Sequence, residues 1–356
     1  MVYCEVSTSW ADQVTMIPFE SLSHEAQLER FSDAAEHILP VFGLIDCEIT
    51  PIKYVDNAVF AVDGLPGQYV LRVHRRGHKP PEQIESEMRW LADICAQTDL
   101  CVPEPIPTID GALSARVQVE GIPEPLSCVL FSWVEGQPCP VEETTPAQAE
   151  QLGAFLARLH NFAATYQPPP GFDRPRLDWE GLFGSRSPYN PGDGARIFTP
   201  QLVRVMDAVA GKVRAVMMAL DADPANTGLI HADFIAKNYL FHDGKVCAID
   251  FEYCSFGYFL YDLAPLLLNF SPLPHYAELK AALWNGYTSL RPLPDYQRDY
   301  LETFVAGRHV ASCRWIAGNL DNPMVRDRAP RILEHRRQEL EAFLQTGRLE
   351  RKSEIL

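Results

Sequence analysis

The sequence lacks the features that mark a secreted, disulfide-rich or membrane-spanning protein. Its nine cysteines form no Cys-x-x-Cys pair and their number is odd, which favours reduced thiols over a disulfide framework or a zinc site. The N-terminus has no cationic start followed by an apolar core, so we expect no signal peptide. The apolar run from Leu263 to Phe270 is too short for a bilayer, which takes about 20 residues. These absences predict a cytoplasmic protein without membrane contact.

The chain also lacks an excess of basic residues. It has 31 Lys and Arg against 47 Asp and Glu, a net charge of -16, which argues against binding to nucleic acid. An acidic surface attracts cationic partners, although many soluble proteins are acidic without such a partner. The 356 residues are 47% hydrophobic and 22% charged, as in globular proteins, and exceed one compact core. We therefore expect two lobes.

The apolar pattern changes from sheet-like to helical along the chain. The β-branched and aromatic segments 57–62 and 68–73, joined by the turn 64–67, predict a hairpin, with further strands at 114–119 and 128–134. Helical periodicity and end signals occur at 24–43, 81–95, 146–166, 200–220, 258–270, 275–289, 295–318 and 324–346. A second hairpin is expected near 238–250, with its turn at Asp243-Gly244.

This pattern predicts an α+β, bilobal fold. An N-terminal extension with a helix covers residues 1–44, and a small N-lobe with an antiparallel sheet covers 45–136. A larger, mainly helical C-lobe covers 137–356.

The candidate catalytic residues lie in the segment His231-Ala-Asp-Phe-Ile-Ala-Lys-Asn238, which is followed by a predicted hairpin and then by Ile249-Asp250-Phe251. Transfer of a phosphoryl group from ATP needs a carboxylate that accepts the proton of the attacking hydroxyl, and oxygen ligands for magnesium. Asp233 suits the first task, while Asn238 and Asp250 suit the second because the hairpin returns the chain between them. Without a chemical role, the three residues would be loop caps and a strand end that fall at this spacing by chance.

These residues resemble those of the aminoglycoside phosphotransferase and choline kinase superfamily, relatives of the protein kinases. Glu252, Trp133-Val-Glu-Gly136 and Gly257-Tyr-Phe-Leu-Tyr-Asp262-Leu-Ala also match, over roughly residues 25–345. The resemblance is closest to the branch of homoserine kinase type II and stress-response kinase A.

The resemblance implies a role for each matching residue. Asp233 would be the catalytic base, and Asn238 and Asp250 the magnesium ligands. His231 would brace the loop, and Asp262 would stabilise the catalytic region. ATP and Mg²⁺ would be the cofactors, and the acceptor a small molecule with a hydroxyl group.

Nucleotide-binding residues are expected in the N-lobe. Arg72 stands where kinases carry a strand lysine, and Glu87 stands where its helical partner should be. Backbone groups of Ser132 and Val134 are expected to meet adenine, with Phe131 at the back of the pocket. The alternatives are an exposed strand residue for Arg72, a solvated helix face for Glu87 with Glu85 as the partner instead, and core packing for Phe131. No Gly-x-Gly-x-x-Gly occurs, and the turn at 54–57 takes its place.

The sequence does not name the acceptor or the oligomeric state. Amino alcohols, homoserine, aminoglycosides and other sugars all stay open, because the acceptor pocket varies across a shared fold. Its wall is expected in the helical segment 258–325. If the acceptor is cationic, Glu252 and Asp321 are the carboxylates expected to meet it, although Asp321 is equally placed to cap the next helix.

Three other functions stay open at this point. A protein Ser/Thr kinase is disfavoured because the chain lacks an Ala-Pro-Glu segment and a long activation loop. A non-catalytic nucleotide-binding module is disfavoured because the base and both metal ligands are intact. A non-haem iron oxygenase would combine His231 and Asp233 with His275 or His309, but that chemistry usually sits in an all-β jelly roll.

Overall fold

The computed structural model describes residues 19–54, 57–65, 67–77 and 79–349. Residues 55 and 56 of the predicted turn at 54–57 and the segment that bears on a signal peptide lie outside the described residues. The chain divides into two compact units, Met1–Pro81 with Pro105–Trp133 and Glu82–Glu104 with Val134–Leu356.

The first unit is an antiparallel sheet packed against a helix. Its strands are β1 (Glu48–Tyr54), β2 (Asn57–Gly64), β3 (Gly67–His74), β4 (Pro105–Ile106), β5 (Ala115–Val117) and β6 (Leu126–Ser132). The order in the sheet is β1-β2-β3-β6-β4, and β5 also pairs with β6. The predicted hairpin is confirmed, since β2 pairs with β3 from Asn57–His74 to Gly64–Gly67.

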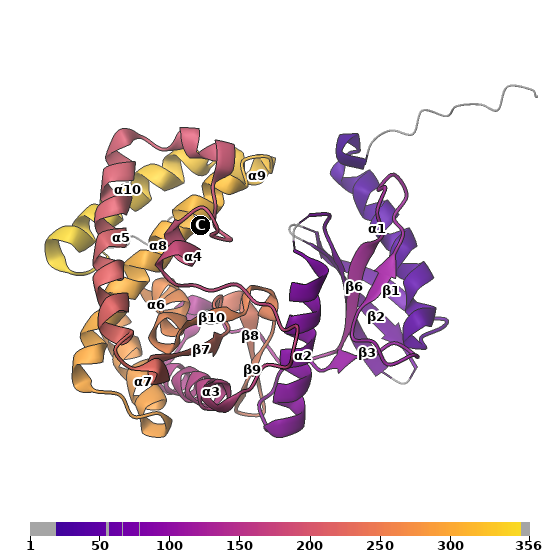
Figure 1. The fold of residues 1–356 in the computed structure, drawn as a ribbon, viewed down its shortest axis with the longest axis horizontal. Helices are drawn as coiled ribbons and strands as arrows, with labels where there is room; N and C mark the ends of the chain where they lie inside the picture. The colour runs from indigo at the N-terminus through magenta and orange to yellow at the C-terminus, as the bar shows by residue number, and fades with distance from the viewer. Residues whose placement is uncertain (1–18, 55–56, 66, 78, 350–356) are drawn as a thin grey trace, which may run out of the picture. The chain divides into compact units, whose positions relative to one another are not determined.

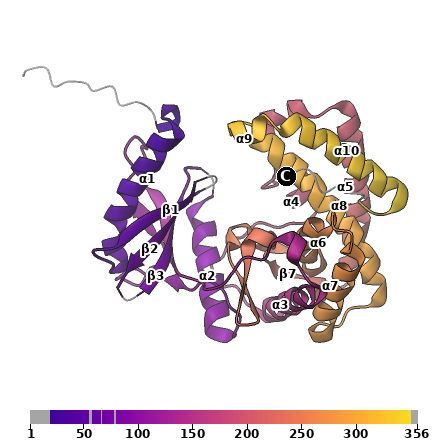
Figure 2. The same cartoon turned by 180° about the vertical axis from the view of Figure 1, so that it is seen from behind.

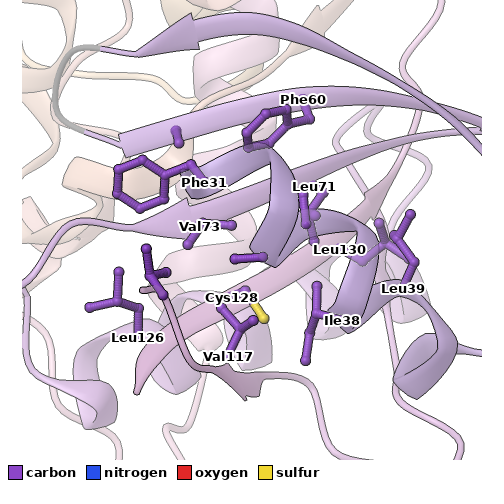
Figure 3. Close-up of a cluster of buried hydrophobic side chains, with 14 of the residues drawn as sticks. Phe31, Ile38, Leu39, Phe60, Leu71, Val73, Val117, Leu126, Cys128 and Leu130 are labelled. Carbon is purple, nitrogen blue, oxygen red and sulfur yellow. The ribbon is translucent and has the colours of Figure 1, made fainter. Parts of the chain in front are cut away.

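The core of this unit lies between the sheet and α1 (His24–Ile38). Figure 3 shows Phe31 and Ile38 of the helix facing Phe60, Leu71 and Leu130 of the strands. The α-helix ends earlier than the predicted residue 43, because Pro40 removes a backbone donor and the chain continues as a 3₁₀ turn over Leu39–Phe42.

The second unit is mainly helical (Figure 1). Its helices are α2 (Pro81–Gln97), α3 (Pro146–Thr165), α4 (Trp179–Phe183), α5 (Pro200–Leu220), α6 (Ala264–Phe270), α7 (Tyr276–Leu290), α8 (Leu301–Gly318), α9 (Pro323–Arg326) and α10 (Ala329–Thr346). Two short antiparallel pairs join them: β7 (Thr227–Ile230) with β10 (Ser255–Tyr258), and β8 (Tyr239–His242) with β9 (Lys245–Ala248). The α+β class and the split into a sheet-bearing and a helical part are confirmed.

Capping residues and periodicity predicted some helix boundaries correctly and others wrongly. The start of α3 is confirmed by a capping box between Thr145 and Gln148. The helix predicted from 258 begins only at Ala264, because the preceding residues pair with β7 and then form a 3₁₀ turn. The helix predicted from 295 likewise opens with a 3₁₀ turn, and α8 begins at Leu301.

The prediction that all cysteines are reduced thiols is wrong for one pair. Cys101 and Cys247 form a disulfide, with their Cα atoms 4.5 Å apart and 146 residues between them in sequence. Chain spacing carried no sign of this pair, because the fold alone brings the two segments together. Among the described residues, no helix is long and apolar enough to cross a bilayer.

Helices α3 and α7 lie side by side in both views of the fold (Figures 1 and 2). They approach closely because glycines face the opposite backbone. A Cβ atom at Gly153 of α3 would overlap the carbonyl oxygen of Leu283, and one at Gly286 of α7 would overlap that of Glu150. Glycine at these two positions therefore sets the spacing of the helix pair.

Gly153→Ala should lower the free energy of unfolding by about 1–3 kcal/mol, because the added methyl group forces α3 and α7 apart. Gly211→Ala in α5 is the matched control, since a Cβ atom there meets nothing within 4 Å. That change should stabilise the protein by about 0.4–1 kcal/mol through the lower entropy of the unfolded chain. Urea denaturation of both variants tests the packing, and equal effects would contradict it.

Candidate active site

The predicted base and one predicted metal ligand share a loop between β7 and β8. The Asn238 Nδ2 atom donates to the Asp233 carbonyl oxygen at 2.8 Å and to Asp233 Oδ2 at 3.0 Å. These two bonds close the loop and orient both side chains. They occupy the amide nitrogen of Asn238 and leave its carbonyl oxygen, which is the atom able to bind a cation.

The second predicted metal ligand reaches this loop through the β8–β9 hairpin. The hairpin turns at Asp243-Gly244, where both residues have positive φ angles. The Ile249 amide then donates to the backbone carbonyl of Asn238 at 2.9 Å, and the side-chain Oδ1 atom of Asn238 takes no part in this bond, so Asp250 follows directly beside the loop. Asp250 is left-handed (φ 62°, ψ 63°), half-buried, and its carboxylate makes no hydrogen bond within the described residues. The structure thus brings together the three side chains that the spacing singled out.

Asp262 fixes the backbone at the start of the loop through hydrogen bonds. Its two carboxylate oxygens accept from the backbone amides of His231 at 2.8 Å and Ala232 at 2.6 Å. Ala232 has a φ of 68°, a conformation that costs a non-glycine residue energy, and the paired bonds hold it there. His160, fully buried on α3, bonds Asp262 Oδ2 at 3.0 Å, and burial lowers the pKa of its imidazole.

His231 connects the loop to the end of β9. Its Nε2 atom lies 3.1 Å from the Ile249 carbonyl, and its Nδ1 atom accepts from the Asp233 amide at 3.3 Å. This arrangement requires the neutral tautomer with the proton on Nε2, and it occupies both nitrogens within the protein. His231 therefore has the contacts of a brace.

The iron-oxygenase alternative is contradicted by the placement of its ligands. His309 lies 2.6 Å from Glu339, and His275 lies 3.4 Å from the Thr144 carbonyl. Over the part of the chain that the structure describes, no three His, Cys, Asp or Glu side chains form a group able to hold a metal ion.

Arg308 of α8 is a residue of the site that the sequence analysis missed. Its Nη2 atom donates to Asp233 Oδ1, and both side chains are only 12% exposed. Burial raises the pKa of Asp233, while the nearby charges of Arg308 and Lys237 oppose that rise. No local signal marks Arg308, because it lies 75 residues beyond its partner on an ordinary-looking helix.

Arg174 is a second missed residue. It is buried and donates to three carbonyl oxygens: Gln83 at 2.8 Å, Cys254 at 2.7 Å and Glu252 at 2.5 Å. It therefore ties the start of α2 to the turn that follows Asp250. The ring of Trp90 on α2 also packs at 76° against that of Phe251, 5.6 Å away. A lone arginine in a Pro/Gly-rich stretch gave no sign of this role.

Of the predicted nucleotide residues of the first unit, Arg72 and Phe131 are buried and Ser132 is half-buried. Arg72 on β3 is 5% exposed, so it is not the exposed strand residue of the alternative interpretation, and its Cζ atom lies 5.2 Å from the centre of the Phe131 ring. Ser132 ends β6 opposite Tyr69, and Val134 follows the strand. In the second unit, Glu87 is fully buried on α2. Their contacts with nucleotide, and the pairing of Arg72 with Glu87, stay predictions.

The two predicted acceptor carboxylates differ in burial. Glu252 is 4% exposed and lies in the turn after Asp250. Asp321 is exposed in the turn after α8. Their role toward an acceptor also stays a prediction.

The sequence is similar to those of known phosphotransferases and kinases. Residues 48–299 match the phosphotransferase enzyme family, and the chain belongs to that family. A homoserine kinase of Gluconacetobacter diazotrophicus is 28% identical over 266 residues, covering 71% of this chain and 75% of that protein. An amicoumacin kinase of Bacillus subtilis is 24% identical over 255 residues, covering 70% and 69%.

A solved structure gives the same result for the fold. The structure of a microcompartment-associated aminopropanol kinase has a TM-score of 0.78 at 25% identity, covering 89% of this chain and 99% of that one. The resemblance inferred from the sequence is confirmed, and the chain is an enzyme whose relatives are small-molecule kinases.

Asp262→Asn should lower the free energy of unfolding by about 2–3 kcal/mol, because an amide nitrogen would then face a backbone amide that needs an acceptor. Asp207→Asn, an exposed site on α5, is the control and should change stability by less than about 0.5 kcal/mol. Chemical denaturation measures both changes. A neutral Asp262→Asn variant would mean that Asp262 does not hold the loop.

Proposed function

We propose that this protein transfers the γ-phosphate of ATP to a hydroxyl group of a small molecule, with Asp233 as the catalytic base. The observation that supports this most is the convergence of Asp233, Asn238 and Asp250, since the loop bonds and the hairpin deliver three oxygen-bearing side chains to one place. Phosphoryl transfer depends mainly on positioning and on charge stabilisation, and a pre-built loop serves that need.

In this proposal Asp233 orients the acceptor hydroxyl and accepts its proton. Its two oxygens are already fixed by Asn238 and Arg308, so the carboxylate does not have to reorganise when the acceptor arrives. Each oxygen also retains a further lone pair for the hydroxyl. Asp262 and His231 act through the loop, by holding the backbone on either side of Asp233.

A magnesium ion fits the residues present. Asn238 offers its carbonyl oxygen, and the Asp250 carboxylate has no hydrogen bond within the described chain. Magnesium is usually held by one or two such protein groups together with substrate phosphates and water, so a larger protein cage is not required. When bound, the ion would neutralise charge on the phosphates.

The acceptor is proposed to be a small hydroxyl compound of the kinds named for the relatives, such as an amino alcohol or homoserine. For a cationic group on such an acceptor, we keep Glu252 and Asp321 as the candidate partners. We also propose Arg72 as a contact for the ATP phosphates, because a buried guanidinium suits paired phosphate oxygens. A panel of hydroxyl compounds, read by ADP release against a control without acceptor, tests the proposal.

Asp233→Asn should retain MgATP binding but lower turnover by about a hundredfold or more, because the hydroxyl proton loses its acceptor. Calorimetry with MgATP and steady-state turnover separate these two effects. Turnover at the wild-type rate would remove Asp233 from the role of base. A wild-type protein that binds MgATP but phosphorylates no acceptor would favour the non-catalytic binding module.

Asn238→Ala and Asp250→Asn should each raise the magnesium concentration needed for half-maximal turnover, because the ion loses or weakens an oxygen ligand. Asp243→Asn is the matched control. It removes a carboxylate from the same hairpin, but its side chain is 87% exposed at the tip. Calorimetry of ATP binding with and without magnesium gives a readout independent of turnover. An unchanged magnesium dependence in both site variants would exclude them from the metal site.

A further inference from the structure

The carboxylate proposed as the base has a cationic partner from a distant helix. Arg308 lies near the middle of α8, inside the segment 258–325 in which the acceptor wall is expected. Its bond to Asp233 Oδ1 places a guanidinium beside the atom at which an acceptor hydroxyl must bind. Whatever compound is phosphorylated has to fit next to this cation.

The guanidinium of Arg308 is held among aromatic side chains. Its Cζ atom lies 5.2 Å from the centre of the Tyr189 ring, and that ring stacks in parallel on Tyr253 at 6.0 Å. The fully buried Tyr261 also interacts electrostatically with Arg308, and its hydroxyl has no hydrogen-bond partner within the described residues. Burial lowers the pKa of Arg308, but Tyr189, Asp233, Tyr261 and Tyr253 together raise it by more, so the side chain stays a cation.

Only part of the hydrogen-bonding capacity of Arg308 is used by Asp233. A guanidinium has five N–H donors in a fixed fork, and the bond to Asp233 Oδ1 uses one of them. The fork geometry matches a carboxylate or phosphate, with two parallel hydrogen bonds. The side chain is 12% exposed, so it is not fully closed off from a small molecule at Asp233.

The positive charge of Arg308 also favours one class of acceptor over another. An acceptor whose only charge is an ammonium group would bring a second cation toward a partly buried guanidinium, which is unfavourable at short range. An acceptor with an anionic group beside its hydroxyl would instead gain charge-assisted hydrogen bonds. Such an acceptor can still carry an ammonium group, directed elsewhere, for example toward Glu252.

We propose that Arg308 is an acceptor-binding residue that selects hydroxyl compounds with a carboxylate close to the hydroxyl over the corresponding amino alcohols. This rests on the proposed kinase function and narrows its acceptor class. A purely structural Arg308 would hold α8 to the catalytic loop and would not discriminate between acceptors.

Three matched pairs of compounds test the proposal, because the members of each pair differ only by a carboxylate. They are serine and ethanolamine, threonine and 1-aminopropan-2-ol, and homoserine and 3-aminopropan-1-ol. Wild-type protein, Arg308→Gln, Arg308→Lys and Arg314→Gln are compared by kcat/KM with saturating MgATP. Calorimetric binding of each compound in the presence of a non-hydrolysable ATP analogue gives a second readout.

The wild type should prefer the carboxylate member of at least one pair by tenfold or more. Arg308→Gln should reduce that preference by about ten- to a hundredfold, because a charge-assisted pair of hydrogen bonds is lost. Arg308→Lys keeps the positive charge but lacks the forked guanidinium, so its preference should lie between those of the wild type and Arg308→Gln. Arg314→Gln changes an arginine of the same helix that bonds the Gly184 carbonyl, and it should keep the wild-type preference.

The preference is a ratio within one variant, so any general damage to Asp233 cancels. An Arg308→Gln variant that does not fold leaves Arg308→Lys and the wild-type pairs as the test. A wild type that binds or phosphorylates the carboxylate-free members equally or better overturns the proposal, as does an Arg308→Gln variant with unchanged preference. A failure of the proposed kinase function gives a different result: no compound of the three pairs or of the wider acceptor panel would then cause ADP release from ATP.

Discussion

The two hydrogen bonds from backbone amides to Asp262 are the constraint on which the rest of the site depends. They fix Ala232 in a left-handed conformation, and this sharp turn sets the direction in which Asp233 leaves the strand β7. The carboxylate is itself secured by His160, which is buried on α3. The position of the predicted base is thus set by a buried ion–dipole cluster, and because Asp262 is fully buried, water does not compete for those bonds.

Much of the site could be predicted from sequence because it is local. Asp233 and Asn238 belong to one loop, and a hairpin with an Asp-Gly turn has a length that returns the chain to Asp250. The hairpin of the first unit and the start of α3 were predictable for the same reason, since turn glycines and capping residues act within a few positions.

The rest could not be predicted because its partners are far apart in the chain. Arg308 reaches Asp233 across 75 residues, and Arg174 reaches Gln83 across 91. Tyr258 pairs with β7 and residues 259–263 form a 3₁₀ turn, where periodicity had predicted the start of a helix, and the Cys101–Cys247 bridge had no motif around it. In each case a tertiary contact decides the outcome, while the local pattern fits several outcomes equally well. The family resemblance predicted the loop residues, because the family shares them, but it gave no prediction for Arg308 or Arg174.

The larger compact unit draws on two separate stretches of the chain, Glu82–Glu104 and Val134–Leu356. During synthesis, α2 emerges before most of the residues that it packs against, and Trp90 stays without Phe251 until some 160 further residues have followed. A fragment starting at residue 137 would lack that helix, so Phe251 and the turn after Asp250 would lose their cover, and Arg174 would lose the Gln83 carbonyl. The two units of this protein are therefore not interchangeable modules that can be separated by a single cut, and a chimera that exchanges the larger unit has to carry residues 82–104 with it.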